Sequence, residues 1–356
     1  MQLLGFNKLC ELEDFSDPDL IHTMRDVFQH EIRHFTPAFP QGAEYRKYWE
    51  VAMSIRALRH HSVLRPDALI LGVGAGTEVT SFYLANHVRQ IFATDLYLDP
   101  GAWGRYAPGF MLAEPEKVAP YPYDTRRLVV QHMDGRRLAY PDDTFDGIFS
   151  SGSIEHFGTF QDIAHAAYEM GRVLKPGGVL TISTEFRISG RVSGVGLYGM
   201  KLFGAAELQR YIVEASGLEL VDALDTGISP ATMATKYPFR KFAADMHKQT
   251  KGQGKYPRVG EIVFSKYPHL VLAQRSYVHG SVHLALRKTD HYPAHANAWA
   301  NPRAGSDTDG DRLKATQSTS IARLFNKGQS LTTKVFWALY LNAEERLRNV
   351  RGAKAQ

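Results

Sequence analysis

A glycine-rich turn is the feature of the sequence best suited to chemistry: Leu71-Gly72-Val73-Gly74-Ala75-Gly76-Thr77-Glu78 stands between an expected strand and an expected helix. Glycine lets the backbone approach a ligand closely, and the first turn of the following helix offers unpaired N–H groups. The turn therefore predicts a nucleotide-like cofactor. The dinucleotide fingerprint G-x-G-x-x-G would need glycine at position 77, where this chain has threonine. A bend that serves only to pack the helix on the strand is the alternative interpretation.

Two acidic residues end later strands. Asp95 comes 19 residues after Gly76, and a carboxylate at that place can accept hydrogen bonds from both hydroxyls of a ribose. Asp134, which is followed by Gly135, ends a third strand, where an acid could accept a hydrogen bond from the amine of an adenine ring. The alternative for Asp134 is a residue that ends a strand or caps a helix.

The elements that must position these residues alternate between strands and helices. Strands are expected at 68–72, 90–95, 128–134, 145–150, 179–183, 218–223 and 281–287, and helices at 44–61, 78–86, 163–174 and 204–216. The first five strands are apolar on both faces, which is typical of a mostly parallel sheet covered on both sides by helices. The sequence therefore predicts an α/β fold.

Six motifs in this order resemble class I S-adenosylmethionine-dependent methyltransferases, and in particular the type-11 group that includes ubiquinone-biosynthesis methyltransferases. The motifs are Gly72–Gly76, Asp95, Asp134-Gly135, Tyr140–Asp146, Ile154-Glu155-His156 and Arg172–Gly178. The resemblance is strongest over residues 66–185 and continues more weakly to Arg287. It implies a Rossmann-like, seven-stranded, mostly parallel sheet with an antiparallel last strand and helices on both faces. The cofactor would lie across the carboxyl ends of the strands.

The resemblance implies S-adenosyl-L-methionine as the cofactor and S-adenosyl-L-homocysteine as its product. It places Gly72, Gly74 and Gly76 along the methionine and ribose, Asp95 on the ribose hydroxyls, Leu96 beside the adenine, Asp134 and Gly135 at the adenine amine, and Ser150 and Ser151 beside the sulfonium and the acceptor.

The glycine turn departs from the family pattern at two positions. The family has an acid where this chain has Gly72, and a third glycine where it has Glu78. We therefore expect Glu78 to take over contact with the ammonium group of the cofactor. The alternative is that Glu78 only stabilises the N-terminus of its helix, where a negative charge is favourable.

The methyl acceptor needs residues of its own. Transfer from a sulfonium is an in-line displacement, in which the protein mainly aligns the reactants and excludes water. A hydroxyl acceptor also benefits from a base. His156 and Glu155 are the nearest candidates, and packing of His156 on the following helix is its alternative role.

Composition limits the class of protein. The chain of 356 residues is 44% hydrophobic and 22% charged, as in ordinary globular proteins. Its single cysteine, Cys10, can form neither an internal disulfide nor a Cys-based metal site, and no metal is predicted. We see no signal peptide and no apolar run long enough to cross a membrane, so a cytoplasmic enzyme is expected.

Four parts of the chain are predicted. They are an N-terminal helical extension at 1–62, a methyltransferase domain at 63–289 with an insertion at about 225–280 near the acceptor site, a flexible linker at 290–320 and a basic amphipathic helix at 321–356. The insertion contains a basic segment, 236–258. Two basic segments on a mildly acidic body could attract an acidic ligand, a phosphate or a membrane surface.

The leading prediction is a methyltransferase that acts on a small-molecule or glycan-like acceptor, with an acidic acceptor as one option and nucleic acid as another. The C-terminal helix is expected to dock on its own domain or on a partner, and less readily on a membrane. Two alternatives remain: an inactive cofactor-binding scaffold, and a nicotinamide-dependent oxidoreductase, which Thr77 and the lack of a catalytic dyad disfavour.

Overall fold

The structure is a computed structural model that describes residues 4–33, 38–99, 106–190, 200–238, 241, 266–274, 276–290 and 299. Nearly all of the linker predicted at 290–320, the whole helix predicted at 321–356 and most of the basic segment 236–258 lie outside these residues.

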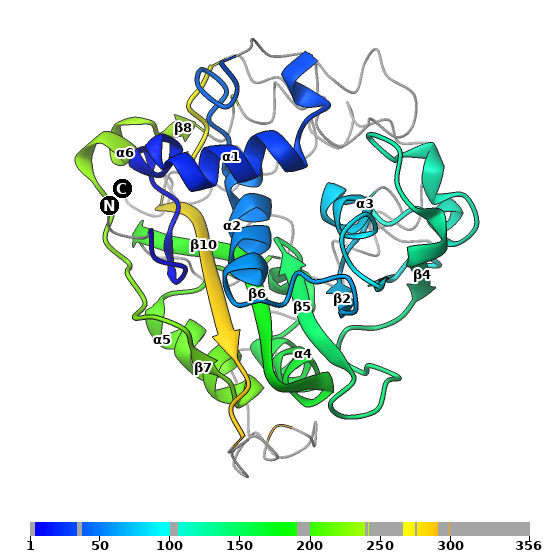
Figure 1. Ribbon diagram of the computed structural model, residues 1–356. Coiled ribbons are helices and arrows are strands. Elements are labelled where there is room, and N and C mark those ends of the chain that lie inside the picture. Colours follow the sequence, from blue (N-terminus) through cyan, green and yellow to red (C-terminus); the bar gives the residue numbers. More distant parts are fainter. Residues whose placement is uncertain are drawn as a thin grey trace, which may run out of the picture.

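One ten-stranded sheet organises the described chain (Figure 1). The strand order is β4-β3-β2-β5-β6-β10-β9-β8, and β1 and β7 also pair with β10. The bounds of the main strands are β2 Leu69–Val73, β3 Gln90–Asp95, β4 Leu128–His132, β5 Phe145–Ser151, β6 Leu174–Gly190 and β10 Tyr277–Arg287. From β4 to β6 the pairs are parallel, and β10 runs antiparallel to β6. The predicted α/β sheet with an antiparallel last strand is confirmed.

The sheet has more strands than the seven predicted, because β10 is much longer than its expected neighbour. The expected sixth strand is β7, Glu219–Leu220, which pairs only with the last two residues of β10. Three further short strands extend the sheet: β1 Lys8–Leu9, β9 Val271–Ala273 and β8 Tyr237–Pro238. Of these, β1 and β9 pair with earlier parts of β10, and β8 pairs with β9. An open sheet edge has unpaired N–H and C=O groups, and these strands satisfy them.

Helices cover both faces, as predicted. The helix bounds are α1 Pro18–Val27, α2 Arg46–His60, α3 Val79–Leu84, α4 Phe160–Val173, α5 Ala205–Leu208, a π turn at Gln209–Glu214 and α6 Pro230–Ala234. Ile70 packs in one core with α1, α2 and α3, whereas its neighbour Leu71 packs in a second core with α4 and the π turn. Successive residues of a strand point to opposite faces, so the two cores lie on opposite sides of the sheet.

The helix α2 is central to the fold, because it lies between α1 and the sheet and touches β5, β6 and β10. Trp49 and Ile55 are fully buried on it, and Arg56 is buried too, with its guanidinium bound to Asp19 at 2.6 Å. The predicted N-terminal extension thus contributes a strand to the sheet and a helix to the core. Short 3-10 turns complete the described chain at Leu12–Ser16, Glu31–Arg33, Gly109–Leu112, Pro115–Lys117, Thr125–Arg127 and Ile154–His156.

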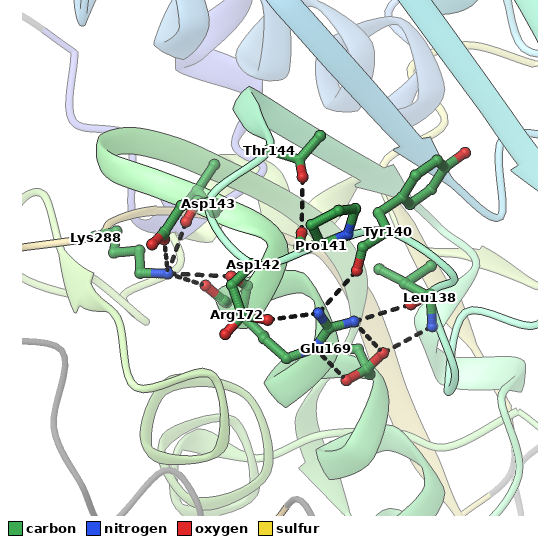
Figure 2. A network of polar contacts seen from close by, with 11 residues as sticks. Leu138, Tyr140, Pro141, Asp142, Asp143, Thr144, Glu169, Arg172 and Lys288 are labelled. Atoms are coloured by element: carbon green, nitrogen blue, oxygen red, sulfur yellow. Dashed lines mark hydrogen bonds and ion pairs between the residues drawn. The ribbon is translucent and has the colours of Figure 1, made fainter.

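A polar network ties the loop before β5 to the end of α4, at the amino edge of the sheet (Figure 2). The guanidinium of Arg172 binds Glu169 at 2.8 Å and Asp142 at 2.7 Å, and donates to two loop carbonyls. Lys288 binds Asp143 and donates to the carbonyls of residues 171, 172 and 174. A cation at a helix C-terminus is favourable. The network therefore connects the loop before β5, the end of α4 and the residue after β10, at the opposite end of the parallel strands from the glycine turn.

Within the described residues no helix combines the length and apolar character needed to cross a membrane. The same part of the chain holds no group of three or more His, Cys, Asp or Glu side chains arranged for a metal ion.

Candidate functional site

The glycine turn joins β2 to α3 at the carboxyl edge of the parallel strands. Gly74 and Gly76 have φ angles of +68° and +47°, which glycine adopts without strain. A Cβ on Gly74 would lie 2.5 Å from the hydroxyl of Ser153, and one on Gly76 would lie 2.8 Å from the backbone oxygen of Tyr106. Both positions therefore require glycine, and the turn forms a cradle lined by backbone.

Gly72 is placed differently, because it lies inside β2 and is buried. A Cβ there would lie 2.6 Å from the ring of Phe149, so the missing side chain makes room for core packing. The hydroxyl of Thr94 donates to the Gly72 carbonyl at 2.8 Å. Contact between Gly72 and a cofactor stays a prediction.

Asp95 and Gly76 are in direct contact. The Asp95 Oδ2 atom accepts the Gly76 N–H at 2.8 Å, and Oδ1 accepts the N–H of Leu96 at 2.7 Å. Burial raises the pKa of Asp95 above its ordinary value. Each carboxylate oxygen has a second lone pair, so the side chain can still accept two hydrogen bonds from a diol. Tyr97 closes the far side of the turn, since its hydroxyl donates to the Gly76 carbonyl at 2.8 Å.

Asp134 lies at the expected strand end, but Arg136 already binds it. The Asp134 carboxylate accepts the Arg136 Nη2 at 2.7 Å, the Nε at 3.0 Å and the backbone N–H at 3.0 Å. Burial acts to raise the pKa of Asp134, but the hydrogen bonds from Arg136 outweigh it and hold the pKa below its ordinary value. An adenine amine would have to share this carboxylate with Arg136.

Phe157 is a site residue that sequence reasoning missed. A Cβ on Gly135 would lie 2.8 Å from its ring, and one on Gly74 would lie 3.3 Å from it. The ring therefore lies between the glycine turn and the end of β4, next to the place expected for the adenine. The available signal was its position directly after the motif 154–156.

The serines that end β5 have different roles. Ser150 is fully buried, and its hydroxyl lies 2.9 Å from that of Ser153, so it helps to hold the glycine turn. The carbonyl of Ser151 accepts a hydrogen bond from Lys47 Nζ at 3.3 Å. Gly152 follows with a φ of +63°, and a Cβ on it would collide with the same ammonium group.

Charged side chains from α2 surround this strand end. Lys47 Nζ donates to Glu50 Oε2 at 2.6 Å. Glu78, at the start of α3, is half-buried; burial raises its pKa to about 7, although the charge of Lys47 acts in the opposite direction. Lys47 was not predicted, and the sequence holds no signal for it, because α2 reaches the site only through tertiary packing.

A second cluster of charged side chains lies around Glu185, in the second half of β6. The Glu185 carboxylate binds Arg46 of α2, and also His279 of β10 with Nδ1 at 2.8 Å. Burial alone would raise the pKa of Glu185, but Arg46 and His279 hold it well below its usual range. Ser281 donates to Glu50, which connects the two charged groups.

The candidate bases, Glu155 and His156, lie in the 3-10 turn after β5. Glu155 is 2% exposed, and the hydroxyl of Thr184 donates to its Oε2 at 2.9 Å. Burial, together with the charge of Glu185, raises the pKa of Glu155 to about 8. Burial lowers the pKa of His156 to about 4, so its imidazole is neutral at pH 7. The turn thus brings two groups with opposite pKa changes to the end of β5.

Part of the chain is similar to known methyltransferases. Residues 71–182 match a family model described as a methyltransferase domain. A probable S-adenosylmethionine-dependent methyltransferase of Mycolicibacterium smegmatis (strain ATCC 700084 / mc(2)155) is 34% identical over 101 residues, which make up 28% of this chain and 38% of that protein. The chain thus matches well under half of the length of this curated relative.

Two solved structures are also similar. The [4+2]-cyclase SpnF has a TM-score of 0.45 and 17% identity, covering 75% of this chain and 94% of its own. A putative sarcosine dimethylglycine methyltransferase from Galdieria sulphuraria has a TM-score of 0.43 and 13% identity, covering 67% and 85%. At these values neither structure informs the chemistry of this chain.

Proposed function

We propose that residues 71–182, which match a family model described as a methyltransferase domain, form a class I, S-adenosylmethionine-dependent methyltransferase domain, and that the protein transfers a methyl group to a small-molecule or glycan-like acceptor. The resemblance to the ubiquinone-biosynthesis subgroup stays a prediction. When bound, S-adenosylmethionine supplies a methyl group on positively charged sulfur, which is activated for in-line displacement.

The contact between Gly76 and Asp95 is the observation that carries the proposal. The backbone cradle has no room for a Cβ, and Asp95 keeps two acceptor positions at the carboxyl end of β3. These features fit a ribose that is linked to a chain lying along the glycine turn. Asp95 would hold the ribose hydroxyls, Glu78 the ammonium group, and Leu96 and Phe157 the adenine.

Glu155 is the better proton acceptor of the two candidates. Methylation of a hydroxyl or of an amine releases a proton, and a base works best when its pKa is close to the working pH. The pKa of Glu155 is about 8, whereas that of His156 is about 4, which makes His156 a weak base. We therefore expect turnover to rise with pH as Glu155 ionises, and His156 to help close the site against water.

The acceptor is expected to lie near the predicted insertion. The two described ends of the insertion form β8 and β9, and Tyr45 makes a bridge with His269, just before β9. Tyr45 directly precedes Arg46 and Lys47 of the site, so β9 and its partner β8 lie near these residues. An acidic acceptor would meet the basic segment 236–258, most of which lies outside the described residues.

Calorimetric titration with S-adenosylhomocysteine tests the proposal, with NAD and NADP as controls and Asp95→Ala as the site variant. We expect micromolar binding of S-adenosylhomocysteine, its loss in the variant, and no binding of the two dinucleotides. Acceptors can then be screened with a donor that carries a labelled methyl group. Absence of binding would overturn the proposal, and binding of NAD alone would favour the oxidoreductase. Binding of S-adenosylhomocysteine without methyl transfer to any screened acceptor would favour the inactive cofactor-binding scaffold.

A further inference from the structure

We propose that Lys47 of α2 binds the α-carboxylate of the cofactor's amino-acid tail, and so makes the site selective for ligands that carry a free carboxylate. The inference rests on the proposed function and deepens it, since it concerns the carboxylate of the cofactor, for which the glycine turn and Asp95 supply no cationic side chain.

Lys47 lies where three elements meet. Its side chain leaves the first turn of α2, its ammonium group contacts the carbonyl of Ser151 at the end of β5, and Glu78 at the start of α3 interacts with it electrostatically. Gly152 has no side chain, and the ammonium group takes the space that a Cβ would fill. Lys47 therefore lies against the carboxyl end of β5, beside the glycine turn.

The ammonium group of Lys47 has capacity for a ligand. It has three hydrogens, and the described acceptors Glu50 and Ser151 take two of them. The Lys47 side chain is 37% exposed, whereas Glu50 is 2% exposed and also accepts a hydrogen bond from Ser281. Glu50 thus holds the lysine from within the protein, and the third hydrogen of the ammonium group remains for a second anion.

The charges around Lys47 match a zwitterion. The amino-acid tail of the cofactor has one ammonium and one carboxylate group, and the site offers Glu78 for the first and Lys47 for the second. Burial acts to lower the pKa of Lys47, but Glu50 and Glu78 outweigh it and raise the pKa above its ordinary value, so the group stays charged. A charge-assisted hydrogen bond in a partly buried site is stronger than a neutral one.

A matched pair of ligands tests the inference. S-adenosylhomocysteine carries the amino-acid tail, and 5′-methylthioadenosine has the same adenosine and thioether without it. Calorimetric dissociation constants are measured for the wild type, Lys47→Met, Lys47→Arg and the control Lys175→Met. Lys175 is a matched control, because its side chain is also partly exposed, at 38%, and also forms an ion pair with a buried carboxylate, that of Asp146. It lies near the start of β6, at the amino ends of the parallel strands and away from the glycine turn.

We expect Lys47→Met to weaken the binding of S-adenosylhomocysteine by about 10- to 100-fold and to leave that of 5′-methylthioadenosine within about twofold. Lys47→Arg should restore most of the affinity, and Lys175→Met should change neither constant. A thermal melt of each variant shows that it is folded.

Three results would overturn the inference. Tighter binding of S-adenosylhomocysteine by Lys47→Met would mean that the lysine only fills the place of the ligand's own ammonium group. Equal weakening of both ligands would mean a structural role, and no change would mean no contact. If the wild type binds neither ligand, the proposed function fails as well, so the two failures are distinguishable.

Discussion

Glu155→Gln is expected to stabilise the protein, by an amount that grows with pH. Burial, with the charge of Glu185 adding to it, raises the pKa of Glu155 from 4.5 to about 8. Folding therefore opposes ionisation of this carboxyl, and the wild type loses stability as pH rises from 4.5 to about 8. Glutamine has the same shape without the charge, and its oxygen can still accept the hydrogen bond from Thr184.

The size of the effect follows from the two pKa values. A tenfold change in proton affinity corresponds to about 1.4 kcal/mol. The difference between 4.5 and about 8 is therefore worth about 5 kcal/mol when the carboxyl is fully ionised. About 1 kcal/mol of this destabilisation of the wild type is already present near pH 5. The gain in the free energy of unfolding that Glu155→Gln brings should therefore increase by about 3 to 4 kcal/mol between about pH 5 and about pH 8.5.

Urea unfolding, followed by circular dichroism at both pH values, measures this gain. Glu114→Gln is the control, because that carboxylate is 48% exposed and its loss should change stability by less than about 1 kcal/mol at either pH. Methyl transfer by Glu155→Gln should fall with the loss of the base, in a protein that is more stable than the wild type. A gain that is the same at both pH values would refute the reasoning, because Glu155 would then ionise in the folded protein without cost.

Three further changes test the framework of the site. Arg46→Met leaves the buried Glu185 without its main cation and should lower the free energy of unfolding by about 3–5 kcal/mol in urea at pH 7. Because the pKa of Glu185 is depressed, the stability contributed by the ion pair is lost as pH falls. An equal loss of stability in acid would contradict the pairing. Gly152→Ala would place a Cβ on a residue whose φ is +63°, and this Cβ would collide with the ammonium group of Lys47. The melting temperature should therefore fall by a few degrees, and S-adenosylhomocysteine should bind more weakly. Unchanged affinity would show that Lys47 moves aside freely. Lys288→Met should cost about 1–3 kcal/mol of stability and leave the affinity for S-adenosylhomocysteine unchanged, and a change in affinity would mean that the network at the amino edge reaches the site.

The core of the fold was predictable from the sequence because its signals are local. Strand β3 has the predicted bounds, 90–95, and α4 begins within three residues of its predicted start. Gly76 and Asp95 could be assigned in advance to one predicted cofactor site because β2 and β3 are adjacent parallel strands, whose carboxyl ends lie together, but the hydrogen bond between them was not predicted.

The edge of the sheet was not predictable. Strands β1 and β8 have two residues each, too few for any periodicity, and they form only because a neighbouring strand offers a partner, β10 for β1 and β9 for β8. Strand β6 runs on to Gly190, well past the predicted end at residue 183, because its later residues pair with the first half of β10. Such pairings depend on the partner strand and not on the residues themselves.

The sequence by itself determined the α/β fold, the glycine turn and the acid that ends the next strand. Only the tertiary structure decided the charge state of the site. The packing of α2 on β5 and β6 brings Lys47 and Arg46 to Glu78 and Glu185, and the contacts of the 3-10 turn Ile154–His156 with β6 and α4 bury Glu155. The pKa of a carboxyl depends on its distance from water and from other charges, and residues far apart in the chain set both.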